Sequence, residues 1–88
     1  MAEHVWHLSR KTAKPIDAVT VVGPVAADFR CVLIVTNNGP DPVEIRAGKR
    51  VIRSVAPMQS AAVQAMGEIA LGLTESGQVA NGHFRLLA

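Results

Sequence analysis

Turn-forming residues recur along the chain at short, regular intervals, and this spacing constrains the fold more than any other feature. They fall at residues 13–15, 23–24, 37–42, 47–49, 56–57, 75–77 and 81–82. The segments between them are about five to nine residues long and rich in β-branched side chains, which favour strands. The spacing predicts an all-β fold, a small antiparallel β-sandwich of six to eight strands, and not alternating βαβ units.

The alternation of apolar and polar residues indicates which side chains face the core. Trp6 and Leu8, for example, share one face of the first segment, and Val5 and His7 share the other. The pattern is compatible with an Ig-like Greek key and with a jelly roll. The residues expected in or near the core are Trp6, Leu8, Val21, Phe29, Cys31, Leu33, Val35, Ile45, Ile69, Leu71, Phe84 and Leu86.

Residues 57–67 fit two local structures. Pro57 near the start, Gly67 at the end and the Ala, Gln and Met residues between them suit a short helix over residues 58–66. The same segment also fits a chain that leaves one strand, turns after Pro57 and enters the next strand. We favour the extended alternative.

Composition bounds the size and class of the protein. A chain of 88 residues, 49% of them hydrophobic and 18% charged, is typical of one globular domain, so residues 1–88 are taken as a single domain. Residues 1–14, which are richer in basic residues and histidine, are a candidate N-terminal arm that packs at an edge or on a neighbour. The net charge of +2 is too small to indicate a nucleic-acid partner by itself.

The sequence carries neither a signal-peptide pattern nor an apolar run long enough to span a membrane. Its one cysteine, Cys31, lies in an apolar segment, where a thiol behaves as a small buried hydrophobe, and it rules out an intrachain disulfide. We therefore expect a protein that is made in a reducing compartment, without a membrane segment.

Side chains that could carry chemistry are sparse. His4 and His7 are three residues apart, which on a strand directs them to opposite faces, and no nearby Cys or Glu completes a metal site with them or with His83. The acidic residues flank turns, and the glycines do not form a phosphate-binding loop. We expect no catalytic residue, no cofactor and no metal, and hence no enzymatic activity.

The strongest charge feature is a cluster of basic residues around Gly48, formed by Arg46, Lys49, Arg50 and Arg53. A hairpin through Gly48 would gather these side chains at one end of a sheet, where they could contact phosphate or an acidic protein. Basic residues also keep edge strands soluble and unpaired. With almost no aromatic residues to stack on bases, the cluster argues against a nucleic-acid partner.

Val32 and Ile34 form a second apolar stripe, opposite the stripe of Cys31, Leu33 and Val35. A small two-sheet sandwich covers only one face of each sheet. We therefore expect Val32 and Ile34 to contact another chain or the N-terminal arm, and we expect a homo-oligomer, with a trimer as one form. The basic cluster would then lie at the rim and steer binding to an acidic partner.

From Val32 to Ala88, the chain resembles a known group of phage proteins. Residues 37–45 follow the pattern N-x-G-x-x-x-V-x-I, a Val55-Ala56-Pro57 step leads to Ser60, and the last strand follows Gly82. These features are similar to those of small β-sandwich accessory proteins of tailed-phage virions, the capsid decoration or cement proteins and related fibre-base domains. One departure is that Met58 stands where the pattern has glycine after proline.

The resemblance implies a non-catalytic virion protein that is made in the host cytoplasm and that binds and stabilises a capsid or tail lattice. Its partner would be a capsid or other virion protein. One alternative is a small cytoplasmic inhibitor or adaptor, for example a phage anti-defence protein. Another is a subunit of a cellular assembly.

Overall fold

The computed structural model describes residues 3–23, 31–65 and 67–87. Eight strands, and no helix, occupy these residues, which confirms the predicted all-β fold. The strands are β1 (His4–Ser9), β2 (Ala18–Val22), β3 (Cys31–Pro40), β4 (Val43–Ala47), β5 (Arg50–Val55), β6 (Gln59–Ala65), β7 (Ile69–Leu73) and β8 (Val79–Leu87). The extended alternative for the segment after Pro57 is therefore right as far as Ala65, while Met66 lies outside the described residues.

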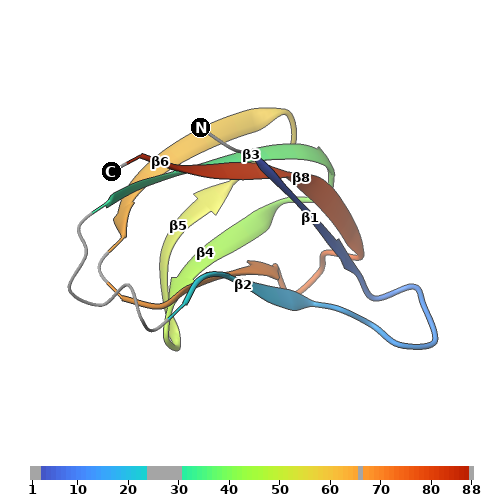
Figure 1. Ribbon diagram of the computed structural model, residues 1–88. Helices are drawn as coiled ribbons and strands as arrows, with labels where there is room; N and C mark the ends of the chain where they lie inside the picture. Colours follow the sequence, from blue (N-terminus) through green and yellow to red (C-terminus); the bar gives the residue numbers. More distant parts are fainter. Residues whose placement is uncertain (1–2, 24–30, 66, 88) are drawn as a thin grey trace.

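The strands form two four-stranded antiparallel sheets that lie face to face (Figure 1). Sheet A has the order β1-β8-β3-β6, and sheet B has the order β2-β7-β4-β5. Strand β1 pairs with β8, β2 with β7, β3 with β6 and β4 with β5, as in an antiparallel ribbon of four strand pairs. The ribbon wraps so that β8 also pairs with β3 and β7 with β4. This connectivity is that of an eight-stranded jelly roll, one of the two sandwich types compatible with the sequence.

The core fills the space between the sheets. Leu8, Leu33, Ile45 and Leu71 are fully buried, and the predicted core residues Trp6, Cys31, Val35 and Ile69 are also buried. Buried residues that the alternation did not single out are Val22, Val43, Val55, Ala61, Ala65, Leu73 and Ala80.

Three of the predicted core residues lie at the margin of the core, and a fourth cannot be placed. Phe84 and Leu86 are half-buried and pack against the core cluster. Val21 is also half-buried, because an irregularity in the pairing of β2 between Thr20 and Val22 moves the fully buried position to Val22. Phe29 lies outside the described residues.

Glycine is needed where β8 crosses the core beside β3. A Cβ atom on Gly82 would collide with the backbone carbonyl of Thr36 and would lie 2.8 Å from the indole ring of Trp6. Because Gly82 has no side chain, the Trp6 ring can lie over the backbone of β8. This contact helps to hold β1 beside β8, at the edge of sheet A.

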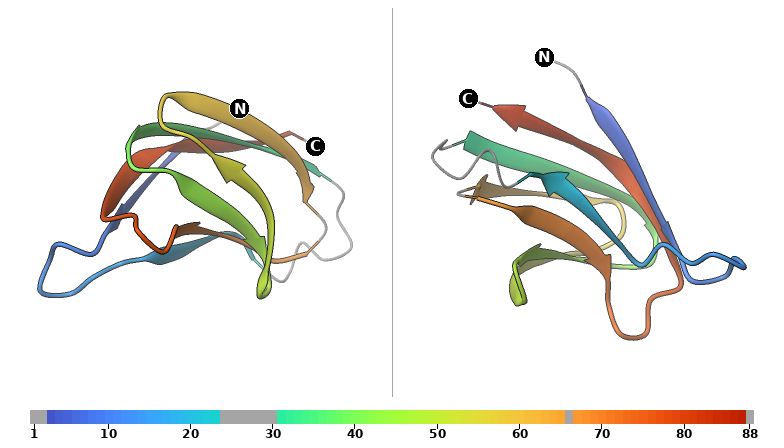
Figure 2. Two further views of the ribbon diagram at one scale, coloured as in Figure 1. Left: turned by 180° about the vertical axis from the view of Figure 1, so that it is seen from behind. Right: turned by 60° about the horizontal axis from the view of Figure 1, so that its bottom comes forward.

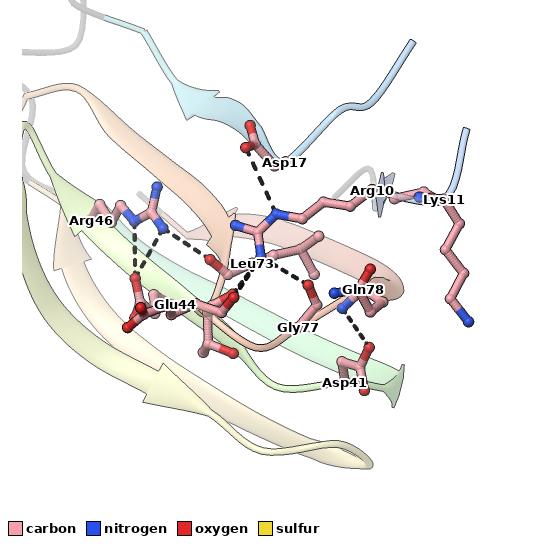
Figure 3. Close-up of polar contacts among 12 residues, drawn as sticks. Arg10, Lys11, Asp17, Asp41, Glu44, Arg46, Leu73, Gly77 and Gln78 are labelled. Atoms are coloured by element: carbon pink, nitrogen blue, oxygen red, sulfur yellow. Dashed lines mark hydrogen bonds and ion pairs between the residues drawn. The ribbon is translucent and has the colours of Figure 1, made fainter. Parts of the chain in front are cut away.

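Arg10 and Asp41 hold together the loops at one end of the sandwich (Figure 3). Nη1 of Arg10 donates to the carbonyl oxygens of Thr74, Gly77 and Glu75, at 2.7, 2.8 and 3.1 Å. Oδ2 of Asp41 accepts the backbone N–H groups of Gln78 and Val79, at 2.7 and 2.9 Å.

The hydrogen bonds from Val79 and Gln78 lower the pKa of the Asp41 carboxyl below its ordinary value, because they favour the ionised form. Arg10 and Asp41 together tie the loop between β7 and β8 to the rest of the fold.

Candidate protein-binding surface

The residues predicted to bind a partner lie on two different sheets. Val32 and Ile34 belong to β3 and face away from sheet B. Arg46, Lys49, Arg50 and Arg53 belong to strands β4 and β5 of sheet B and to the turn between them. The structure therefore does not bring the apolar stripe and the basic cluster together on one surface.

The outer face of sheet A carries the apolar stripe of Val32 and Ile34. No helix among the described residues covers it, and it extends over all four strands of the sheet (Figure 1). Strand register and the alternation of buried and exposed positions assign its members: Val5, His7, Val32, Ile34, Thr36, Ser60, Ala62, Gln64, Asn81, His83, Arg85 and Leu87.

The centre of this outer face is apolar. In the register of sheet A, Val32 lies between Leu87 on β8 and Gln64 on β6. Ile34, one row along, lies between Arg85 and Ala62. Val32, the second residue of β3, remains 39% exposed, although it has a neighbouring strand on each side.

Polar groups border the apolar residues on the side of Thr36 and on β6. In the row beyond Ile34, Thr36 lies between His83 and Ser60, and the Thr36 and Ser60 hydroxyl oxygens are 2.8 Å apart. Arg85 is exposed, and no ion pair within the described residues joins it to a carboxylate. An apolar centre with arginine and a polar rim is the usual composition of a protein–protein interface.

The side chain of Arg46 is held against the surface of its own sheet, sheet B. Its guanidinium lies over Gly72, where an added Cβ atom would overlap it. It donates from Nη2 to the Leu73 carbonyl at 3.0 Å, and it contacts Oε2 of Glu44 through Nε at 3.1 Å and Nη2 at 3.0 Å (Figure 3). With its donors directed at these groups, Arg46 stabilises the β4–β7 pair.

The other three basic residues of the hairpin differ in their surroundings. Arg53 extends from β5 toward β6, where its Nη1 donates to the Ala62 carbonyl oxygen at 3.1 Å. Lys49 and Arg50 are exposed at the turn between β4 and β5. Two of the four predicted cations thus have partners within the chain, and two point to solvent.

Three carboxylates of the described chain also have internal partners. Glu44 contacts Arg46, Asp41 accepts backbone N–H groups, and Oδ2 of Asp17 lies 3.8 Å from Nε of Arg10. Among the described residues, three exposed carboxylates have no ion pair: Glu3, Glu68 and Glu75. Six exposed cations have none: Lys11, Lys14, Lys49, Arg50, Arg53 and Arg85. The surface that is free to meet a partner is therefore predominantly positive.

His4 lies on the opposite face of sheet A from His7 and His83. His4 stacks on Phe84, with 5.1 Å between ring centroids, while His7 lies on the opposite side of β1. Within residues 3–23, 31–65 and 67–87, the structure contains no group of three or more His, Cys, Asp or Glu residues that could hold a metal ion.

A pocket of about 400 Å³ lies beside β1. His7 and Lys14 line it together with the neutral residues Ser9, Thr12, Ala13 and Ile16. Lys14 and His7 thus line one pocket, at the end of β1 where the chain turns toward β2.

Sequence reasoning missed Arg85, the charged residue at the centre of the outer face. The alternation in residues 83–87 places Arg85 opposite Phe84 and Leu86, and this was the available signal. The alternation does not reveal that β8 lies beside β3, which is what brings Arg85 next to Ile34.

Comparison with protein-family models, with curated proteins and with solved structures finds no match to this chain. Within the described residues, the structure has no helix with both the length and the apolar character needed to cross a membrane.

Proposed function

We propose that this protein is a non-catalytic accessory protein of a phage virion, which binds a capsid or tail lattice through the outer face of sheet A. The observation that carries the proposal is the composition of that face. Val32, Ile34 and Leu87 provide apolar area beside Arg85, and no ion pair within the described residues neutralises the arginine.

The partner surface would be apolar with acidic groups at a position that meets Arg85. Arginine is frequent among the residues that dominate binding energy, because its guanidinium pairs with a carboxylate while its stem packs on apolar groups. Lys49 and Arg50, exposed on sheet B, would add long-range attraction to an acidic lattice. Attachment would then weaken as salt screens these charges.

The test is co-sedimentation of the purified protein with tailed-phage capsids, at low and at high salt. We expect Arg85→Glu to reduce binding more than tenfold, because the new carboxylate would face the acidic groups of the partner. A tenfold reduction corresponds to a loss of about 1.4 kcal/mol of binding free energy. Val32→Thr should also weaken binding, since it replaces a methyl group of the apolar centre with a hydroxyl.

Val51→Thr is the matched control. Val51 is 46% exposed on β5 of sheet B, so the same chemical change there should leave capsid binding unchanged. Equal effects of Val32→Thr and Val51→Thr would contradict the assignment of the outer face. A protein that stays folded and sediments with no capsid at any salt would instead favour the cytoplasmic inhibitor or adaptor.

A further inference from the structure

The free edge of β1 differs from the other three sheet edges. Natural β proteins protect edge strands with bulges, charged side chains or covering groups, because an exposed edge pairs with other chains. Strand β2 has an irregular register at Val22, and β5 has a register shift and carries Arg50 and Arg53. On β6, Arg53 covers the Ala62 carbonyl.

Strand β1 has none of these features. Its six residues pair with β8 without a register shift, and the segment HVWHLS contains no Lys, Arg or Pro. On its other side, the chain bridges β1 only at Ser9, which pairs with Ile16. Beyond that bridge, β1 and β2 diverge, so the first half of β1 lies clear of sheet B (Figure 2).

The bridge also shows which backbone groups of β1 are free. Ser9 donates its N–H to the Ile16 carbonyl and accepts the N–H of Ile16, so its polar groups point away from β8. Backbone groups alternate along a strand, so those of His7 and Val5 point the same way, and those of Glu3 follow. Within the described residues, no strand pairs with these positions on the side of β1 away from β8.

We propose that two copies of this chain pair antiparallel through β1, about a two-fold axis at Val5. Because Ile16 already occupies the edge at Ser9, the free hydrogen-bonding positions are Glu3, Val5 and His7. A two-fold axis at Val5 uses all three, placing Val5 opposite the second Val5 and each Glu3 opposite the His7 of the other copy. This proposal is independent of the proposed function.

The side chains match this register. Val5 is 88% exposed, the highest value among the exposed large hydrophobic residues, and it would be covered by its counterpart. Glu3 would lie beside His7, which can donate a hydrogen bond to a carboxylate. Lys14 lines the same pocket as His7 and adds positive charge there. The apolar Val5 pair would thus be flanked on each side by a pair of Glu3 and His7, and complementary cross-strand pairs of this kind stabilise antiparallel strands.

Analytical ultracentrifugation of the full chain and its variants tests the register. We expect the wild type to dimerise reversibly and Glu3→Lys to weaken dimerisation about tenfold or more, since it opposes a lysine to His7 at two symmetric positions. Combining Glu3→His with His7→Glu exchanges the two members of each pair, so it should restore dimerisation that Glu3→His alone reduces. A wild-type chain that stays monomeric at about 1 mM would overturn the proposal.

Disulfide trapping locates the axis. Opposed Cα atoms in a hydrogen-bonded antiparallel pair are about 5.5 Å apart, within the range of a disulfide. Val5→Cys should therefore form a cross-linked dimer on mild oxidation, whereas His7→Cys, opposite Glu3 of the other copy, should not. Val51→Cys, an exposed position on β5, is the control for random collision. Equal cross-linking of the three variants would refute the register.

Discussion

Asn37 is a buried polar residue whose replacement should remove a large part of the stability of the domain. It is fully buried near the end of β3. Its Nδ2 donates to the carbonyl oxygens of Asp41 at 2.9 Å and Val55 at 3.0 Å, and its Oδ1 accepts the N–H of Gly39 at 2.7 Å. One amide side chain therefore links the turn between β3 and β4 to the end of β5.

The Asn37→Ala substitution breaks all three hydrogen bonds. The bonds to Gly39 and Val55 are buried, so their partner groups lose a bond without gaining water, which costs about 1–3 kcal/mol each. The bond to the Asp41 carbonyl is half-buried and contributes about 0.5–1.5 kcal/mol. The expected loss is about 2.5–7.5 kcal/mol, out of a total of about 4–13 kcal/mol for a domain of this size.

Urea unfolding followed by tryptophan fluorescence measures this loss, because the one tryptophan, Trp6, is buried. Asn38→Ala is the matched control, since Asn38 is the next residue along the chain and is exposed. It should change the free energy of unfolding by no more than about 0.5 kcal/mol. A loss below about 1 kcal/mol for Asn37→Ala, or equal losses for both variants, would refute the reasoning.

Four further substitutions test other parts of the fold. Gly82→Ala should prevent stable folding, seen as loss of the cooperative urea transition, because its Cβ would meet the Thr36 backbone. Leu33→Ala, at a fully buried position of β3, should lower the unfolding free energy by about 2–5 kcal/mol. Met58→Gly should raise it by about 0.5–1 kcal/mol, since the exposed Met58 has a φ of 66°. Asp41→Asn should remove part of the acid dependence of stability. Because folding lowers the pKa of Asp41, its contribution to the unfolding free energy is complete above the ordinary value of 3.8 and is lost as the pH falls through the folded-state pKa. The unfolding free energies of the variant and the wild type, measured in urea, should therefore converge in acid.

The elements of the fold were predictable because strand alternation is a local property. Neighbouring residues are enough to predict the two faces of β1 and the buried stripe through Leu33. They also favour the extended segment after Pro57. Met58 illustrates a subtler signal. The phage-protein pattern has glycine at this position, and Met58 adopts the left-handed conformation that glycine favours.

The candidate binding surface was less predictable, because it depends on which strands are neighbours. Arg46 is close to Arg50 and Arg53 in sequence, but the absence of a side chain on Gly72 of β7 lets its guanidinium lie within sheet B. Arg85 is distant from Ile34 in sequence and becomes its neighbour through the β3–β8 pairing. Charge clustering along a chain therefore does not identify the charges that share a surface.

The two proposals have a common geometric consequence. Strand β1 is at one edge of sheet A, so pairing two copies through β1 would join both outer faces into one continuous sheet of eight strands. Each dimer would then present two copies of Arg85 and Val32 on the same side. If the outer face binds a lattice, the second contact forms at a high effective concentration once the first is made. A weak single contact would then suffice for stable attachment, which fits an apolar centre as small as that around Val32 and Ile34.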